Sequence, residues 1–252
     1  MKIGLALSGG GARGIAHIGM LKAFEEAGIT FNMVTGTSAG AIVGAFYCHG
    51  YTPDEIMDFV KTTRVFRLMR LAMSRSGLLN MAAMQKIYTR YFPEDNFNSL
   101  KKPLVISTIN LKQGKSTFFY EGELIKPIMA SSAVPVIFHP VEIHGEYYVD
   151  GGIMNNLPVE PLIGHCDKII GFHCNPVDDN YQIGNFRSVL ERCLLMAIYS
   201  NARMKKSSCD IFLEPPAMKN IGAFEFSRAD DIFKIGYDYA KHEMENVMAA
   251  LK

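Results

Sequence analysis

The apolar positions of this chain alternate between short continuous runs and longer stretches with helical spacing. Residues 2–7 (KIGLAL) are an apolar run that ends in glycines, and residues 13–27 carry apolar side chains at the spacing of a helix. The same layout returns in a run at 31–36, which is followed by helical spacing at 39–50. Apolar runs separated by helices are typical of buried strands, so the pattern predicts an α/β fold with a parallel or mixed sheet covered on both faces.

The rest of the chain continues this alternation. Another helix is expected to begin at Thr52, with Pro53 in its first position and Glu55 placed to complete a capping box. Further elements are predicted as strands at 103–111, 116–122, 167–175 and 209–215, a hairpin at 139–150 turning at His144-Gly145, and helices at 123–133, 186–206 and 230–251. Residues 153–162 indicate the start of a helix. Because no linker, low-complexity segment or repeat interrupts the chain, we expect a single domain over residues 1–252.

Composition and charge narrow the classes of function. Apolar residues make up 48% of the 252 positions and the formal net charge is +1, so a large core is expected and nothing favours a nucleic-acid partner. The five cysteines form no C-x-x-C pair, which favours reduced, mostly buried thiols. The N-terminus lacks the apolar length of a signal peptide, and no run is long enough to span a membrane. We therefore expect a soluble cytoplasmic protein.

Two glycine-rich loops follow predicted strands, and the first is SGGGARG at residues 8–14. Its glycines match the spacing G-x-G-x-x-G of dinucleotide-binding loops, but the next strand ends in TGTSAG without the acidic residue that holds a ribose. What remains is a set of uncovered backbone N–H groups beside a helix N-terminus, which attracts negative charge. That charge can belong to a phosphate or to an oxyanion formed during acyl transfer, and the loop alone leaves both alternatives open.

The second loop, GTSAG at residues 36–40, matches G-x-S-x-G with a predicted strand before it and a helix after it. This context predicts that Ser38 is a nucleophile on a tight, strained turn, with the Ala39 N–H close to its hydroxyl. The alternative is a turn of small residues that only packs, which the strand–turn–helix context makes the weaker interpretation. Because turns after parallel strands open on the same edge of a sheet, we expect the two glycine loops to meet.

A serine nucleophile needs a base, and the seven histidines are weak candidates. His173 follows an apolar strand and is the most site-like of them, whereas His242 falls in a charged helix. Asp150 is the better candidate because it ends a strand and precedes Gly151 and Gly152, which leave room for close approach. The alternative is an ordinary Asp-Gly turn. A carboxylate whose pKa is raised by burial can act directly as the base.

Four motifs in this order resemble the patatin-like phospholipase family: SGGGARG (8–14), GTSAG (36–40), ASSAVP (130–135) and DGG (150–152). The resemblance extends from residue 2 to about residue 175. It implies a three-layer α/β/α fold with a mainly parallel central sheet. It also implies a lipid acyl hydrolase that forms an acyl-enzyme through a catalytic dyad, with Ser38 as the nucleophile and Asp150 as the general base.

The resemblance further implies how the first loop functions. Gly9, Gly10 and Gly11 would form the oxyanion hole, Arg13 would support it, and no metal or cofactor would be required. Ser8 stands where many members have aspartate, and DGG where others have DGA, but neither departure touches this chemistry. The expected partner is a lipid or ester substrate. Two alternatives stay open, namely an acyltransferase or transacylase with the same dyad, and a phosphate- or nucleotide-binding module that uses SGGGARG.

Residues 59–93 stand out as a basic, methionine-rich helical insertion that contains seven lysine and arginine residues and no acidic residue. Apolar residues are interleaved with these cations, which predicts peripheral contact with an anionic membrane through residues 61–75, at the inner membrane surface. The alternative is an ordinary amphipathic helix whose apolar side covers the sheet. The pattern favours this alternative for residues 80–93.

Overall fold

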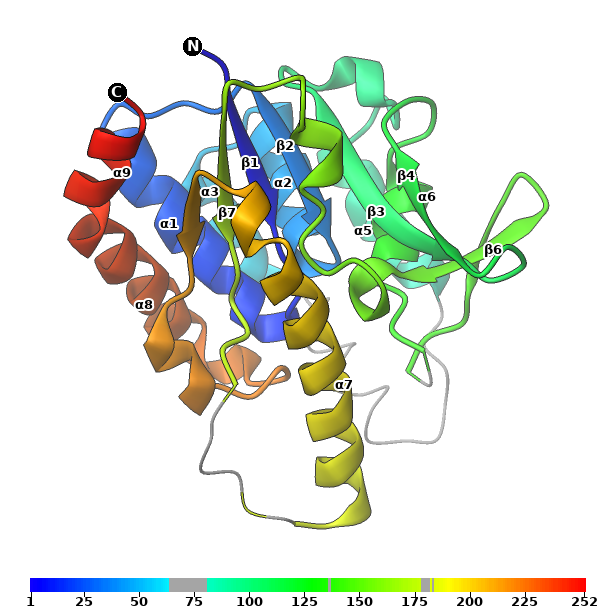
Figure 1. Cartoon of the computed structure of the whole chain (residues 1–252). Coiled ribbons are helices and arrows are strands. Elements are labelled where there is room, and N and C mark those ends of the chain that lie inside the picture. Colours follow the sequence, from blue (N-terminus) through cyan, green and yellow to red (C-terminus); the bar gives the residue numbers. More distant parts are fainter. Residues whose placement is uncertain (64–80, 136, 178–181, 183) are drawn as a thin grey trace.

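The computed structural model describes residues 1–252 except 64–80, 136, 178–181 and 183, and its strands form one sheet (Figure 1). The eight strands of this sheet are β1 (Ile3–Leu7), β2 (Met33–Thr37), β3 (Leu104–Asn110), β4 (Lys115–Phe119), β5 (Val141–Ile143), β6 (Glu146–Asp150), β7 (Lys168–Phe172) and β8 (Ile211–Leu213). Five of them pair in parallel in the order β3-β2-β1-β7-β8. At the β3 edge, β4 and β6 pair antiparallel with β3, and β5 pairs antiparallel with β6. The sheet is therefore mainly parallel, as predicted.

Helices flank the sheet in the described part of the chain. The α-helices are α1 (Ile15–Glu26), α2 (Ala39–His49), α3 (Pro53–Thr62), α5 (Met81–Tyr91), α6 (Ile125–Ser131), α7 (Phe186–Met204), α8 (Ala229–His242) and α9 (Met244–Ala250). Short 3₁₀ helices are η1 (Gly11–Gly14), η2 (Phe97–Ser99), η3 (Gly151–Ile153), η4 (Glu160–Leu162), η5 (Lys206–Ser208), η6 (Pro216–Asn220) and η7 (Phe226–Arg228). The helices α1 and α8 run side by side, and α7 extends away from the rest of the molecule (Figure 1).

Both faces of the sheet are apolar, but they are covered unequally. Along β1, Leu5 and Leu7 belong to the main core with α1, α2 and α8, whereas Ala6 belongs to a smaller core on the other face. That smaller core is covered mainly by the segment around Leu157 and Leu162 and by the last turns of α7. The predicted α/β architecture is confirmed, with one thick helical layer and one layer built largely from short 3₁₀ helices.

Two local predictions are confirmed in detail. The turn between β5 and β6 has positive φ angles at both His144 (50°) and Gly145 (77°), as a tight hairpin connection requires. At the start of α3, the Glu55 N–H donates to Thr52 Oγ1 and the Thr52 N–H donates to Glu55 Oε2, which is a complete capping box. In both places a few adjacent residues satisfy their own backbone, so the sequence pattern was sufficient.

Two other predictions differ from the structure. Residues 153–162 form no α-helix but a loop that contains the last residue of η3 and all of η4, in keeping with Pro158 and Pro161, each of which removes a backbone donor. The predicted helix over 230–251 is divided at Glu243 into α8 and α9. The thiols are free as expected, but only Cys48 and Cys174 are buried, and Cys193 on α7 is exposed.

Much of the basic insertion falls outside the described residues, because residues 64–80 include most of the range 61–75 predicted to contact a membrane. Its described parts are the end of α3 and all of α5. Met84 and Tyr88 of α5 are buried in the main core, as expected for an ordinary amphipathic helix. Lys61 pairs with Asp230 at 2.6 Å. Among the described helices, none has the length and apolar character needed to cross a bilayer.

Candidate active site

Ser38 lies on a strained turn at the carboxyl end of β2. Its φ of 53° and ψ of −121° are unusual for a residue with a side chain, and a backbone of this kind costs about 1–3 kcal/mol. The flanking glycines make the turn possible. A Cβ added to Gly36 would lie 2.5 Å from the Gly40 carbonyl oxygen, and one added to Gly40 would lie 2.4 Å from the Leu7 carbonyl oxygen. Side chains at these two positions would therefore collide with the backbone of the neighbouring strand and helix.

Asp150 ends β6, and its carboxylate lies close enough to the Ser38 side chain for the hydroxyl to affect its pKa. The carboxylate accepts the Gly152 N–H at 2.8 Å. Burial raises the pKa of Asp150 from 3.8 to about 6, and the Ser38 hydroxyl and the Gly152 N–H limit the rise because both favour the charged form. Asp150 is 6% exposed. Two residues that are far apart in the chain thus lie next to each other.

The segment ASSAVP (130–135) holds both residues by their backbones. The Ser38 N–H donates to Ser131 Oγ at 2.8 Å, and the Ser131 hydroxyl in turn donates to the Ser107 carbonyl at 2.7 Å. The Asp150 N–H donates to the Ala133 carbonyl at 3.1 Å. In the sequence this motif contributed only to the family resemblance. In the structure it is a clamp that sets the positions of Ser38 and Asp150 relative to each other.

The first glycine loop lies against Ser38, as the parallel pairing of β1 and β2 predicted. A Cβ added to Gly9 would be 3.0 Å from the Ser38 Cβ. However, the Gly9 N–H already donates to both the carbonyl oxygen (3.2 Å) and Oδ1 (3.1 Å) of Asn156. The N–H groups of Gly10 and Gly11 donate to no other group in the described part of the chain. Of the three predicted oxyanion donors, only Gly10 and Gly11 therefore have N–H groups available.

Arg13 is 5% exposed and holds the first glycine loop in place. Its Nε donates to the Ile221 carbonyl at 2.6 Å, and its backbone N–H donates to the Gly10 carbonyl at 3.2 Å. The Ala12 N–H donates to the Ala223 carbonyl at 2.8 Å. These contacts tie the loop to the segment before α8. The predicted supporting position of Arg13 is consistent with this geometry, in which the guanidinium holds the loop rather than the reacting atoms.

Asn156 connects the loop, the Asp150 turn and α7. Besides accepting the Gly9 N–H, it donates its own backbone N–H to Asn201 Oδ1 at 2.9 Å. The Asn201 amide donates to the carbonyls of Gly152 (3.0 Å) and Ile153 (3.2 Å). A Cβ added to Gly152 would lie 3.0 Å from the side-chain oxygens of both Asn156 and Asp150, so these oxygens are within about 6 Å of each other. The two asparagines thus fix the spacing between the loop and the carboxylate.

Sequence reasoning did not identify Ser131, Asn156 or Asn201. A signal exists for the first two, because Ser131 belongs to a motif of the family resemblance and Asn156 is one of two adjacent polar residues in the otherwise apolar run IMNNLPVEPL. Asn201 offers no such signal. It is one of several polar residues on a long helix, and its contacts depend on where that helix packs.

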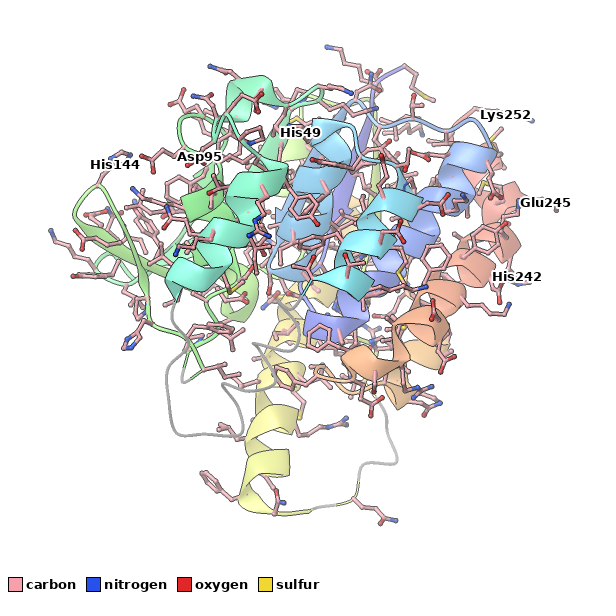
Figure 2. The ribbon with its side chains drawn as sticks, turned by 180° about the vertical axis from the view of Figure 1, so that it is seen from behind. His49, Asp95, His144, His242, Glu245 and Lys252 are labelled. Carbon is pink, nitrogen blue, oxygen red and sulfur yellow. The ribbon has the colours of Figure 1, made fainter. Side chains whose placement is uncertain are left out.

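In the described part of the chain, no histidine forms a hydrogen bond with Ser38. His173 is buried, its Nδ1 lies 2.7 Å from Glu214 Oε1, and its ring neighbours are Tyr199 and Phe212. Burial lowers the pKa of His17 to about 4, so the ring is neutral and its Nε2–H donates to the Ser8 carbonyl at 2.8 Å. Figure 2 shows His242 on the outer side of α8, in keeping with its predicted solvated position.

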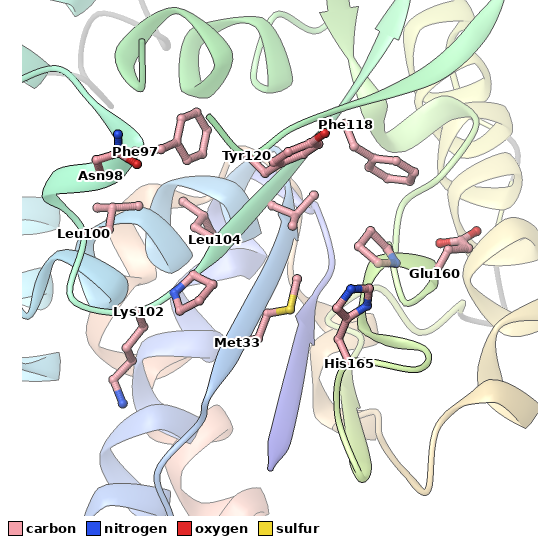
Figure 3. A pocket seen from close by; sticks show the side chains of 13 residues that line it. Met33, Phe97, Asn98, Leu100, Lys102, Leu104, Phe118, Tyr120, Glu160 and His165 are labelled. Atoms are coloured by element: carbon pink, nitrogen blue, oxygen red, sulfur yellow. The ribbon is translucent and has the colours of Figure 1, made fainter. Parts of the chain in front are cut away.

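A cavity of about 840 Å³ lies at the opposite end of the sheet, next to the amino ends of β2 and β3 (Figure 3). Its lining includes Met33, Leu104, Phe118 and Tyr120, with His165 at one side. Ser38 and Asp150 do not line it. Among the described residues, no group of three His, Cys, Asp or Glu side chains is arranged to hold a metal ion.

Comparison with known proteins identifies relatives of this chain. The family model of the patatin-like phospholipases matches residues 5–163. Lysophospholipase nte1 of Aspergillus oryzae is 26% identical over 282 aligned positions, which cover 97% of this chain and 18% of that protein. An NTE family protein of Mycobacterium tuberculosis is 33% identical over 166 positions, covering 65% of this chain and 46% of the relative. The chain thus spans less than one fifth of the length of the first of these relatives.

The fold is also similar to a solved structure. VipD from Legionella pneumophila superimposes with a TM-score of 0.58 at 15% identity, over 97% of this chain and 67% of VipD. At this identity the likeness concerns the arrangement of sheet and helices alone.

Proposed function

Because the chain belongs to the patatin-like phospholipase family, we propose that it is a lipid acyl hydrolase in which Ser38 is the nucleophile and Asp150 is the general base. The observation that supports this most is that the Ser38 hydroxyl lies beside the buried Asp150 carboxylate and lowers its pKa, at a backbone turn that only flanking glycines permit. A carboxyl group with a pKa of about 6 is mostly ionised at neutral pH, yet basic enough to accept a proton.

The proposed reaction has two halves. Asp150 accepts the Ser38 proton while Ser38 Oγ attacks the ester carbonyl, and collapse of the tetrahedral intermediate releases the alcohol, which takes up the proton from Asp150. Asp150 then accepts a proton from water as this water attacks the acyl-enzyme. The fatty acid leaves and the proton returns to Ser38. In this scheme Asp150 alone transfers both protons.

The oxyanion would be held by backbone donors. Gly10 and Gly11 supply N–H groups that are not used elsewhere in the described part of the chain, and the Ala39 N–H at the start of α2 is equally unused. Gly9 contributes differently from the sequence-based expectation. Its bonded N–H and its contact with Ser38 make it a spacer that brings the loop close, because any side chain there would meet Ser38 and Asn156.

Labelling and hydrolysis together test this proposal. Wild-type protein should react covalently with a fluorophosphonate at Ser38, and Ser38→Ala should lose both labelling and at least about 10³-fold of the hydrolysis of a medium-chain nitrophenyl ester. Ser207→Ala, at an exposed position, is the matched control and should keep wild-type activity. Labelling of another residue, or hydrolysis that survives in Ser38→Ala, would contradict the assignment of the nucleophile.

The two alternatives from the sequence make different forecasts. An acyltransferase would convert an added alcohol acceptor into a new ester in preference to releasing free fatty acid, which product analysis measures directly. A nucleotide-binding module would show a higher melting temperature in the presence of ATP or NAD and no reaction of Ser38 with fluorophosphonates. The hydrolase proposal predicts free fatty acid as the main product and no thermal shift with either nucleotide.

A further inference from the structure

Helix α7 carries a stripe of exposed apolar side chains. Phe186, Leu190 and Leu194 recur at intervals of four residues, so they lie along one side of the helix, and their exposed fractions are 84%, 44% and 37%. Further exposed residues on or next to this stripe are Val189, Cys193, Ala197 and Met204. A helix normally buries such a stripe against another element. In the described part of the chain nothing covers it.

The C-terminal end of α7 is bound to the candidate active site. Near the C-terminal end of α7, Asn201 holds the turn that follows Asp150, and this turn exposes Ile153 (39%) and Met154 (46%). From there α7 extends beyond the carboxyl ends of β1 and β2, with its N-terminal end farthest from the sheet (Figure 1). Exposed apolar side chains therefore lie both at the turn that follows Asp150 and along α7.

The same region is strongly basic. Residues 186–206 contain five cationic residues and one acidic one, although the net charge of the whole chain is only +1. The cations are Arg187, Arg192, Arg203, Lys205 and Lys206, and the acidic residue is Glu191. An amphipathic helix with an exposed apolar stripe and an excess of cations has the composition of a segment that lies in the surface of an anionic bilayer.

We propose that α7 binds an anionic lipid surface, with Phe186, Leu190 and Leu194 inserted among the acyl chains, so that lipid esters reach Ser38 directly from the bilayer. The delivery of lipid esters to Ser38 rests on the proposed function, but the binding of α7 to lipid can be measured without hydrolysis. A second copy of the chain is a poorer occupant of the stripe. Two α7 helices packed face to face would bring the cations of both helices together, whereas anionic head groups would neutralise them.

The natural chain contains no tryptophan, so a single introduced tryptophan reports on one position. Leu190→Trp should show emission at shorter wavelength and quenching by brominated lipids when vesicles of phosphatidylcholine and phosphatidylglycerol are added. Tyr120→Trp is the control, because Tyr120 is also exposed but lies at the opposite end of the sheet, and its emission should stay unchanged. An unchanged spectrum for Leu190→Trp, or equal changes for both, would overturn the proposal.

Vesicle flotation gives a second test. The triple variant Phe186→Gln, Leu190→Gln and Leu194→Gln should bind these vesicles at least about tenfold more weakly, because it removes the apolar area that would be buried. The matched control replaces the exposed residues Leu111, Tyr120 and Tyr147 with glutamine and should bind within about twofold of wild type. Unchanged flotation of the α7 variant, or a wild-type dimer that this variant abolishes, would overturn the proposal.

The failure of this inference can be distinguished from the failure of the proposed function. Hydrolysis of a soluble nitrophenyl ester without vesicles should be equal in wild type and the α7 triple variant. If wild type binds vesicles through α7 but lacks Ser38-dependent hydrolysis, the proposed function fails and the lipid contact stands. If Ser38-dependent hydrolysis is present but vesicle binding is independent of α7, the lipid contact fails and the proposed function stands.

Discussion

The two ends of the central sheet differ, because the carboxyl end holds the candidate catalytic residues and the amino end holds the large cavity. At the carboxyl end, Ser38 and Asp150 are nearly buried and lie side by side, and the segment ASSAVP holds the backbones of both. At the amino end lies a cavity of about 840 Å³, lined mostly by apolar side chains (Figure 3). The carboxylate of its acidic residue, Glu160, accepts hydrogen bonds from the Asn155 side-chain amide at 3.0 Å and from the Lys205 ammonium group.

This difference teaches that volume is a poor guide to chemistry. The carboxyl end holds a strained backbone, a carboxylate with a raised pKa and backbone N–H groups without partners, and each of these costs stability. Around the cavity, no described lining residue has a positive φ, and hydrogen bonds from Lys205 and Asn155 outweigh burial and lower the pKa of Glu160. The candidate site is therefore recognised by features that lower the stability of the folded state.

Replacing Asp150 with asparagine should have the largest effect on ester hydrolysis. Asp150→Asn keeps the shape of the side chain but removes the base, so ester hydrolysis should fall by at least about 10³-fold. Asp238→Asn, on the surface of α8, is the control and should leave the rate unchanged. Full activity in Asp150→Asn would show that another group takes the Ser38 proton.

The same variant should be more stable than wild type at pH 8. Because the pKa of Asp150 is raised in the folded state, the folded protein binds more protons than the unfolded chain between about pH 4 and 6, and its stability falls as pH rises through this window. A pKa of about 6 against 3.8 corresponds to about 3 kcal/mol at most, at roughly 1.4 kcal/mol per pKa unit. Urea unfolding of Asp150→Asn should show a gain at pH 8 that disappears near pH 4.

Asn156 should have the next largest effect. Asn156→Ala removes the side-chain acceptor of the Gly9 N–H, leaving only the backbone carbonyl, and should lower kcat by about 10²-fold with little change in KM, because the loop then moves relative to Ser38. Asn156→Asp keeps the acceptor but adds a negative charge within about 6 Å of Asp150. It should recover much of the rate at high pH, with an acid limb above pH 6. Equal losses in both variants at all pH values would indicate a purely structural effect.

The pH dependence of wild-type hydrolysis on the acid side tests the role of Asp150 further. Because Asp150 must be ionised to accept the Ser38 proton, kcat/KM should fall about tenfold per pH unit below an apparent pKa of about 6. A pH series with the nitrophenyl ester measures this limb, with folding checked by circular dichroism at each pH. A flat profile from pH 7 down to 5 would exclude Asp150 as the base.

The smallest effect is expected at the amino end of the sheet. His165→Gln and Phe118→Ala alter the lining of the large cavity and should change the hydrolysis of the soluble ester by less than about twofold, because His165 lies at the far end of the sheet and the backbone pairing of Phe118 with Ser107 does not need the Phe118 side chain. A melting curve of each variant separates loss of folding from loss of chemistry. A specific loss of kcat in folded His165→Gln would link the two ends of the sheet.

The sequence was informative wherever a feature depends on neighbouring residues. The glycines around Ser38, the turn at His144-Gly145 and the capping box at Thr52 could be predicted because each is decided by backbone sterics or hydrogen bonds within a few positions. The order of four motifs also identified the family, which the family model over residues 5–163 confirms. The roles of the individual site residues stay predictions that the experiments above address.

Tertiary structure alone decided which groups are used and which are left available. Sequence grouped Gly9 with Gly10 and Gly11, but Asn156, which lies 147 positions away, takes the Gly9 N–H. The sequence predicted a helix at 186–206, but only the tertiary structure shows that its apolar stripe is exposed. A local pattern determines what a residue can do, whereas hydrogen-bond partners and burial come from distant segments whose positions are set by the folding of the whole sheet.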